Sequence, residues 1–384
     1  MSTETPPMTE NGAVPSSVIN YQHWIDWLKF FGMAIVLGGH TGMDDLIGPR
    51  FNPINPKQLG VAFFVFITGY SLANRGAAPL QTFLRRYSPV FVYGLFLALI
   101  FSCCSWWMRS DLAESNYLPF MGGLNTFFEN AFPANPSTWY IGTYFQLLVI
   151  WALLLRHVTP SWSWFFALMV LEITVRSLWM WFGRDFNAYM SFTSWLPALM
   201  AGMILGRDQV DQSTGARAFS LSAFLSKPGT MLFGGILFFG FLFFWTQLVQ
   251  SYGISKKNPF GRIPTESPLL SIVLTSMSVT LLYVVYTTSL LSFFYRIECP
   301  RWVRFLSRHT LWVFLAHMPV RDIVTPLYYP WIEPGWIRQF VNFLVLFVGL
   351  AWTSEALSKW VHLPAVCKFL ETKVLGLLGQ KERA

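Results

Sequence analysis

Charged residues are scarce in this sequence. They make up 12% of its 384 residues, against roughly 25% in an ordinary soluble domain. The chain also lacks a phosphate-binding P-loop, a glycine-rich dinucleotide fingerprint and an internal repeat. No polar stretch is long enough to form a soluble domain of its own. These absences exclude the common soluble nucleotide-binding folds and predict one membrane-embedded domain.

Cysteine is also sparse, and no histidine or cysteine spacing matches a metal site. Two of the four cysteines, Cys103 and Cys104, are adjacent, and a disulfide between neighbours is strained. The other two, Cys299 and Cys367, lie in predicted cytoplasmic segments. We therefore expect four free thiols and no metal cofactor.

The first twenty residues have neither the basic segment nor the apolar core of a signal peptide. Their Thr, Pro, Ser and Asn content predicts a disordered cytoplasmic tail at residues 1–20. We place a single transmembrane domain at residues 21–365 and a second cytoplasmic tail at residues 366–384.

Hydrophobic residues dominate instead, at 54% of the chain, with 37 Phe and 18 Trp. They form apolar stretches that approach the roughly 20 residues needed to cross about 30 Å of hydrocarbon. The sequence predicts an all-α polytopic membrane bundle with about ten crossings. We place these near residues 24–41, 58–74, 87–108, 138–155, 162–182, 191–206, 230–250, 268–294, 309–329 and 336–361.

The basic residues outside these crossings are distributed unequally. Segments that share a side with the two termini hold 15 Lys and Arg, and the alternate segments hold 7. The positive-inside rule then puts both termini in the cytoplasm, as for a multi-pass protein of the cell's inner membrane. This asymmetry accounts for most of the net charge of +8, so we predict no nucleic-acid partner.

The first crossing carries three ionisable side chains on one stripe. Asp26 and Lys29 lie fourteen and eleven residues before His40, which is close to four and three helical turns. Ionisable groups within a membrane helix are costly and mark functional sites by default. Imidazole is the side chain best suited to take a proton near neutral pH. We predict His40 as a general base, with Asp26 as its catalytic companion or as an ion-pair partner of Lys29.

Two arginines precede the third crossing. Arg85 and Arg86 are either an anchor at the cytoplasmic face or a phosphate site, because each guanidinium can make two parallel hydrogen bonds to phosphate oxygens. Earlier in the chain, Thr68 and Gly69 favour close packing against a neighbouring helix.

Further candidates lie in later crossings. Trp139 and Tyr144 fit either an aromatic belt or a substrate pocket, and Gln146 lies deeper in the same crossing. His317 fits a helix-bonding or a catalytic role, whereas His309 and a Glu172–Arg176 pair fit structural roles. The predicted pocket residues are Trp139, Tyr144, Gln146 and His317.

In their order along the chain, these motifs resemble the membrane acyltransferase-3 family over roughly residues 20–330. The series comprises Asp-x-x-basic followed by His40, Phe-Phe-x-x-x-Thr-Gly ending at Gly69, Arg-Arg-x-x-Pro ending at Pro89, a Trp-Tyr helix, and a late aromatic helix with His317. The resemblance implies transfer of an acyl group, usually acetyl, from cytoplasmic acyl-CoA to a hydroxyl of a glycan or lipid-linked sugar.

Residue by residue, the resemblance carries over unevenly. His40 falls on the family's essential histidine, and Arg86 falls on the arginine before the proline. Lys29 stands where the family usually has arginine, Thr68 replaces a serine, and Phe83 replaces the first arginine of a pair. Lys29 keeps the charge but loses the bidentate geometry of arginine. With these departures, the resemblance implies that Lys29, Arg85 and Arg86 face the coenzyme phosphates. The rival prediction is a transporter, in which the charged stripe lines a permeation path for a small solute or glycan precursor.

Overall fold

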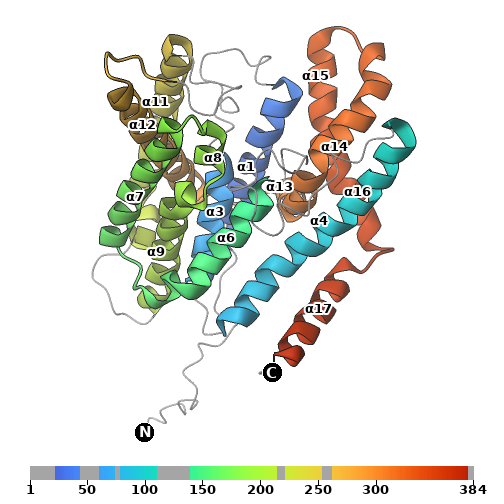
Figure 1. Ribbon diagram of the computed structural model, residues 1–384, viewed down its shortest axis with the longest axis horizontal. Coiled ribbons are helices and arrows are strands. Elements are labelled where there is room, and N and C mark those ends of the chain that lie inside the picture. Colours follow the sequence, from blue (N-terminus) through green and yellow to red (C-terminus); the bar gives the residue numbers. More distant parts are fainter. Residues whose placement is uncertain are drawn as a thin grey trace, which may run out of the picture.

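The computed structural model describes residues 22–43, 60–73, 78–109, 139–213, 221–252 and 262–378. Within these ranges every regular element is a helix. Figure 1 shows α1 and α3 near the middle, α7, α11 and α12 on one side, and α4 with α14 to α16 on the other. The predicted tail at residues 1–20 lies outside the described residues.

All ten predicted crossings coincide with helices. Their bounds are α1 (His23–Thr41), α3 (Gly60–Leu72), α4 (Pro79–Arg109), α6 (Trp139–Leu153), α7 (Trp162–Trp181), α9 (Leu196–Ser213), α11 (Pro228–Tyr252), α12 (Pro268–Phe294), α14 (Thr310–Tyr328), and α15 (Gly335–Leu344) with α16 (Leu350–Ser358). A π-helical segment at Val345–Gly349 joins α15 to α16. Shorter elements are η5 (Leu155–His157), α8 (Asp185–Met190), η6 (Phe192–Trp195), α10 (Leu221–Leu225), α13 (Arg301–Arg308), η7 (Tyr329–Trp331) and α17 (Leu363–Leu377).

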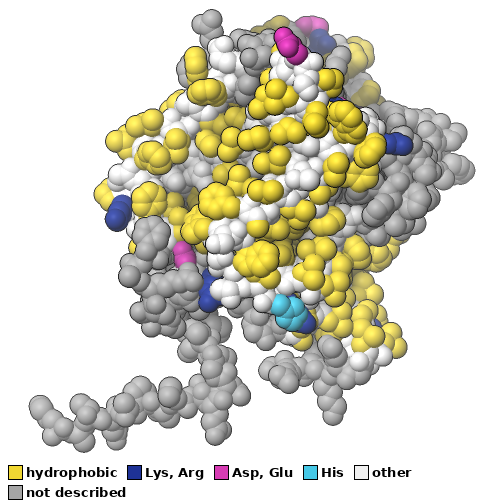
Figure 2. Space-filling model, turned by 60° about the vertical axis from the view of Figure 1, so that its left-hand side comes forward, with side chains coloured by type: hydrophobic (Ala, Val, Ile, Leu, Met, Phe, Trp, Pro, Cys, Tyr) yellow, Lys and Arg dark blue, Asp and Glu magenta, His cyan; other side chains and the backbone are white. Residues whose placement is uncertain are grey.

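The outer surface of the bundle is hydrophobic. Leu232 and Phe244 on α11 are 69% and 66% exposed, and Figure 2 shows a face with many hydrophobic and few charged side chains. Such a surface suits contact with lipid. Within the described residues, five helical spans are long and apolar enough to cross a membrane: Trp139–His157, Trp162–Trp181, Pro228–Gln247, Pro268–Phe294 and Gly335–Ser358. The protein is a helical membrane bundle, as the sequence predicts.

Glycines allow α3 and α9 to approach closely. A Cβ atom added to Gly69 would lie 2.0 Å from the carbonyl oxygen of Leu199, and one added to Gly202 would lie 2.0 Å from that of Phe66. Real side chains do not fit at these distances, so each glycine admits the backbone of the partner helix. The predicted close packing at Gly69 is confirmed.

A buried ion pair joins α7 to α12. Glu172 and Arg176 are 0% and 1% exposed and are bonded to each other. Tyr283 donates a hydrogen bond to Glu172. The guanidinium of Arg176 also donates to the Thr280 hydroxyl at 2.8 Å and to the Ser276 carbonyl at 3.0 Å. Because a buried charge is costly unless it is paired and hydrogen-bonded, this network supports the predicted structural role.

Three helices differ clearly from the predicted boundaries. α9 spans Leu196–Ser213, whereas the predicted crossing spans residues 191–206. α4 begins at Pro79, whereas the predicted crossing begins at residue 87, so the two arginines lie inside the helix. Proline fits the first helical turn, because its missing N–H has no partner there in any case. The predicted C-terminal tail from residue 366 forms most of α17, which packs along α4.

Three cysteines are described as free thiols, as predicted: Cys103 is exposed, and Cys299 and Cys367 are buried. Burial raises the pKa of the Cys299 thiol to about 11. This thiol is therefore protonated at neutral pH. The side chain of Cys104 lies outside the described residues.

Candidate active site

His40 lies in the last turn of α1, where the helix stops. Gly42 follows at a φ of 78°, a left-handed conformation that terminates helices and suits glycine. Just before the stop, Thr41 donates a hydrogen bond to the Leu37 carbonyl at 3.0 Å. The half-buried ring of His40 is thereby held at the edge of the bundle, next to a cavity.

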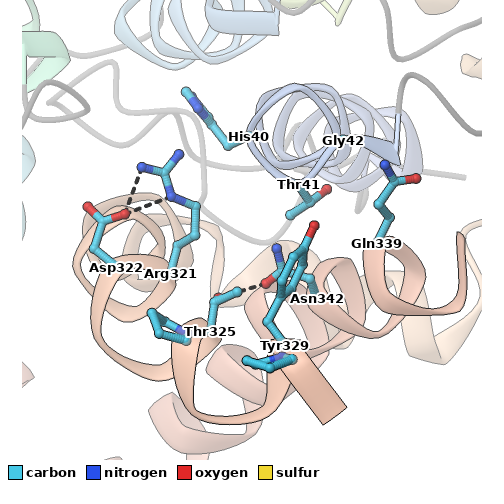
Figure 3. A pocket seen from close by; sticks show the side chains of 11 residues that line it. His40, Thr41, Gly42, Arg321, Asp322, Thr325, Tyr329, Gln339 and Asn342 are labelled. Atoms are coloured by element: carbon cyan, nitrogen blue, oxygen red, sulfur yellow. Dashed lines mark hydrogen bonds and ion pairs between the residues drawn. The ribbon is translucent and has the colours of Figure 1, made fainter. Parts of the chain in front are cut away.

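This cavity, which we call the His40 cavity, has a volume of about 870 Å³. It lies between the end of α1 and the helices α14 and α15, and Figure 3 shows His40 above Arg321 and Asp322. Its lining is mainly polar. The residues are His40, Thr41, Gly42, Arg321, Asp322, Thr325, Pro326, Tyr329, Pro330, Gln339 and Asn342.

The charges that line the His40 cavity cancel, and several of its polar side chains form hydrogen bonds with neighbouring residues. Arg321 and Asp322 form an ion pair at 2.7 Å. The side-chain oxygen of Asn342 accepts hydrogen bonds from Thr325 and Tyr328, both at 2.9 Å. Among the described lining residues, the only formal charges are those of this ion pair. A neutral ligand with hydroxyl groups therefore fits the cavity better than an anion does.

His317 lies one layer deeper. Its side chain is fully buried, and its ring centroid is 5.3 Å from that of His40. Nδ1 lies 2.7 Å from the carbonyl oxygen of Phe314. A carbonyl can only accept, so Nδ1 carries the proton and Nε2 of the neutral ring has a free lone pair. Within the described part of the chain, this Nε2 has no hydrogen-bond partner. The structure thus brings together two of the predicted site residues, His40 and His317.

Asp26 and Lys29 lie at the other end of α1. Asp26 is 7% exposed and accepts a hydrogen bond from Ser307. Ser307 belongs to α13, which packs against α1. Lys29 interacts electrostatically with Asp26 and Arg86. At 1.5 Å per residue, Asp26 is about 21 Å along the helix from His40. A catalytic role for Asp26 stays a prediction, and its described contact joins helices.

Arg85 and Arg86 line a second cavity, which we call the arginine cavity. It has a volume of about 580 Å³ and lies between α4 and α17. Figure 1 places the beginning of α4 and α17 at the end of the bundle opposite to the top of α1. The structure therefore brings both predicted arginines to one cavity. Lys29 is not among its described lining residues.

The predicted pocket residues of α6 lie apart from the His40 cavity. Trp139 packs against Tyr189 and Trp195 with ring centroids 4.6 and 6.2 Å away. Tyr144 contacts the ring of Tyr140 at 5.9 Å. Gln146 is half-buried further along α6. Their role in a pocket stays a prediction, since none is among the described lining residues of the His40 cavity.

Of the residues that line the His40 cavity, only His40 was a predicted site residue. The polar lining residues that escaped the sequence analysis are Thr41, Arg321, Asp322, Thr325, Tyr329, Gln339 and Asn342. Asn342 had a usable signal, because it is a polar residue within an apolar run and is 4% exposed. Thr325 lies within α14, Gln339 lies within α15 and Tyr329 begins η7, so their meeting at one cavity depends on how these elements pack. Within the described residues, no group of three or more His, Cys, Asp or Glu is placed to hold a metal ion.

Comparisons with known proteins bear on this site. Neither the comparison with curated proteins nor that with solved structures gave a match. A comparison with protein families matches residues 22–356 to the acyltransferase-3 family, described as an acyltransferase domain. This range includes the whole of α1, the arginines of α4 and both histidines. The chain belongs to the acyltransferase-3 family of membrane proteins.

Proposed function

We propose that this protein moves an acyl group, most simply acetyl, from cytoplasmic acyl-CoA to a hydroxyl of a glycan, exopolysaccharide or lipid-linked sugar. The observation that carries this proposal is the difference between the two cavities. The arginine cavity is rich in cationic side chains, whereas the His40 cavity is polar and nearly balanced in charge. The first suits an anionic donor, and the second suits a neutral hydroxyl acceptor.

His40 is the base of this reaction. Its imidazole takes the proton of the acceptor hydroxyl as the oxygen attacks the thioester carbonyl. The carbon–sulfur bond then breaks, and the departing coenzyme thiolate takes the proton from His40. His40 thus ends the reaction in the protonation state in which it began. His317 lies beside His40, and the lone pair on its buried Nε2 assists proton transfer or orients the ring.

Donor phosphates and His40 are separated along α1. Lys29, which interacts with Arg86, lies eleven residues before His40, or about 16 Å along the helix. An extended pantetheine arm covers a distance of this order. The arrangement supports a donor that binds its phosphates near α4 and extends its thioester toward His40.

The orientation of the protein is part of the proposal. The excess of basic residues on the side of the termini supports a cytoplasmic arginine cavity in the inner membrane. The His40 cavity then faces the opposite side, where an exported or lipid-linked glycan is available.

The decisive experiment measures free coenzyme thiol released from acetyl-CoA by the purified protein in the presence of an acceptor glycan. Wild-type protein releases thiol, and His40→Ala lowers the rate by about 10²-fold or more, which is the range of general base catalysis. His157→Ala, which changes an exposed histidine after α6, serves as the matched control. A transporter would release no thiol in any variant, and equal rates in wild type and His40→Ala would remove His40 from the mechanism.

A further inference from the structure

α17 forms one wall of the arginine cavity. Its lining residues are Pro364, Cys367, Lys368 and Glu371. Their spacing of three, four and seven positions puts them on one face of the helix. α17 lies beyond residue 356, where the family match ends. The wall is therefore contributed by a part of the chain that the acyltransferase domain does not include.

This wall brings charges of both signs to the cavity. Glu371 accepts a hydrogen bond from Nε of Arg85 at 2.9 Å. The side chain of Arg85 is 49% exposed, whereas that of Glu371 is 12% exposed. Lys368 lies one turn earlier on the same face, and Arg86 also lines the cavity. Three cations thus surround one carboxylate, and that carboxylate occupies one of the guanidinium groups.

A narrower cavity continues from this one. It has a volume of about 270 Å³ and shares the lining residues Pro89, Tyr93 and Pro364 with the arginine cavity. Much of its lining is apolar, including Leu311 and Trp312 of α14. Together the two cavities suit an elongated ligand with phosphates at one end and a thin, less polar arm at the other.

We propose that α17 is part of the phosphate site for acyl-CoA, with Lys368 as a phosphate ligand and Glu371 as a carboxylate that occupies Arg85 until the phosphate displaces it. This inference rests on the proposed function. It adds a binding residue and a competing group from outside the family domain.

A phosphate group is a stronger partner for Arg85 than the Glu371 carboxylate is. An ion pair that solvent reaches contributes little to stability, and the side chain of Arg85 is 49% exposed, so solvent can replace Glu371 as the partner of Arg85. A phosphate group carries a charge of about −1.5 to −2 near neutral pH and offers three acceptor oxygens, which a carboxylate does not match. With the phosphate bound, Lys368 on the facing wall compensates part of its charge. Glu371 remains nearby and repels it.

The test is a binding measurement on the purified full-length protein with CoA as the probe. Lys368→Ala should weaken CoA binding roughly tenfold, as expected for one lost charge-assisted hydrogen bond. Glu371→Gln should tighten binding roughly three- to fivefold, because the competing charge disappears. Both effects should shrink in high salt. Lys373→Ala is the matched control: Lys373 lies on another face of α17, with its ammonium 5.5 Å from the ring centroid of Phe369.

A second variant separates binding from folding. Lys368→Arg keeps the charge and should retain most of the affinity, while the unfolding temperature of every variant is followed in parallel. Dephospho-CoA, which lacks the 3′-phosphate, shows which phosphate is involved. Repeating the titration in nanodiscs of zwitterionic lipid and then of anionic lipid separates the coenzyme from a lipid headgroup as the ligand.

Unchanged CoA affinity in Lys368→Ala and Glu371→Gln, together with a loss in Arg86→Ala, would overturn the role of α17 and leave the proposed function standing. Weaker binding in Glu371→Gln would show that Glu371 only holds Arg85 in place, which also contradicts the inference. A Lys368 effect confined to anionic lipid would assign the site to a headgroup. Wild-type protein without any CoA affinity would overturn both proposals.

Discussion

The rings of His40 and His317 lie with their centroids 5.3 Å apart, although one belongs to the first described helix and the other to α14. His317 donates from Nδ1 to Phe314, and its buried Nε2 has no hydrogen-bond partner among the described residues. In the proposed mechanism, the half-buried imidazole of His40 accepts the proton, and Nε2 of the fully buried His317 is the supporting nitrogen that assists this transfer or orients the His40 ring.

The first prediction concerns that supporting nitrogen. His317→Asn retains an N–H group near the position of Nδ1 for the Phe314 carbonyl but removes the basic Nε2. We expect acyl transfer to fall by about 10²-fold, the lower limit of acid–base contributions, while CoA affinity stays unchanged. Single-turnover rates and CoA titrations measure the two quantities separately. Full activity in a folded His317→Asn protein would assign His317 to packing alone.

The second prediction concerns Arg86. Its replacement by Ala removes a bidentate donor from the arginine cavity, so the KM for acyl-CoA should rise roughly tenfold. The KM for the acceptor should change little. Arg86→Lys should recover only part of the loss, since lysine provides the charge but not the two parallel hydrogen bonds of a guanidinium. If both variants keep the wild-type KM for acyl-CoA, Arg86 is an anchor and not a phosphate ligand.

The third prediction concerns the buried pair between α7 and α12. Arg176→Met leaves the carboxylate of Glu172 buried without its cation, which costs about 3–5 kcal/mol. The double variant Glu172→Leu with Arg176→Met should lose less stability than Arg176→Met alone. Thermal unfolding in detergent compares them, with the exposed Arg301→Met as control. A double variant less stable than Arg176→Met would show that the pair contributes more than charge balance.

The fourth prediction concerns orientation. In a background without the native cysteines, a cysteine at Ala78, just before α4, should react with an impermeant thiol reagent only after cell lysis. A cysteine at Trp331, which is 84% exposed between α14 and α15, should react in intact cells. The reverse pattern would place the arginine cavity on the side without acyl-CoA and would remove the basis of the proposed mechanism.

Helix positions are predictable here because each is set locally. Each of the ten apolar runs bounded by charge, proline or glycine coincides with a helix. The start of α4 was missed because the residues after Pro79 mix polar and apolar types, and hydropathy detects only the apolar part of a helix. α17 was assigned to a tail for the same reason, since Lys368, Glu371 and Lys373 interrupt its apolar residues.

The site was only partly predictable. His40 and the arginines stand out because ionisable groups in apolar segments are rare. The contact between His40 and His317, and the participation of Gln339 and Asn342, depend on how α1, α14 and α15 pack. Sequence periodicity assigns a residue to a face of its own helix, but it does not identify the helix opposite. Asp26 shows this limit, because it shares a helical stripe with His40 and yet bonds to Ser307.

α14 contributes to cavities at both of its ends. Leu311 and Trp312 line the narrow cavity next to the arginines, while Arg321 and Thr325 line the His40 cavity. A ligand that displaces this helix at one end therefore changes the shape of the binding site at the other. By thermodynamic reciprocity, the second ligand then alters the affinity for the first by the same factor. In the proposed mechanism, this single helix would make the occupancy of the donor site and that of the acceptor site interdependent.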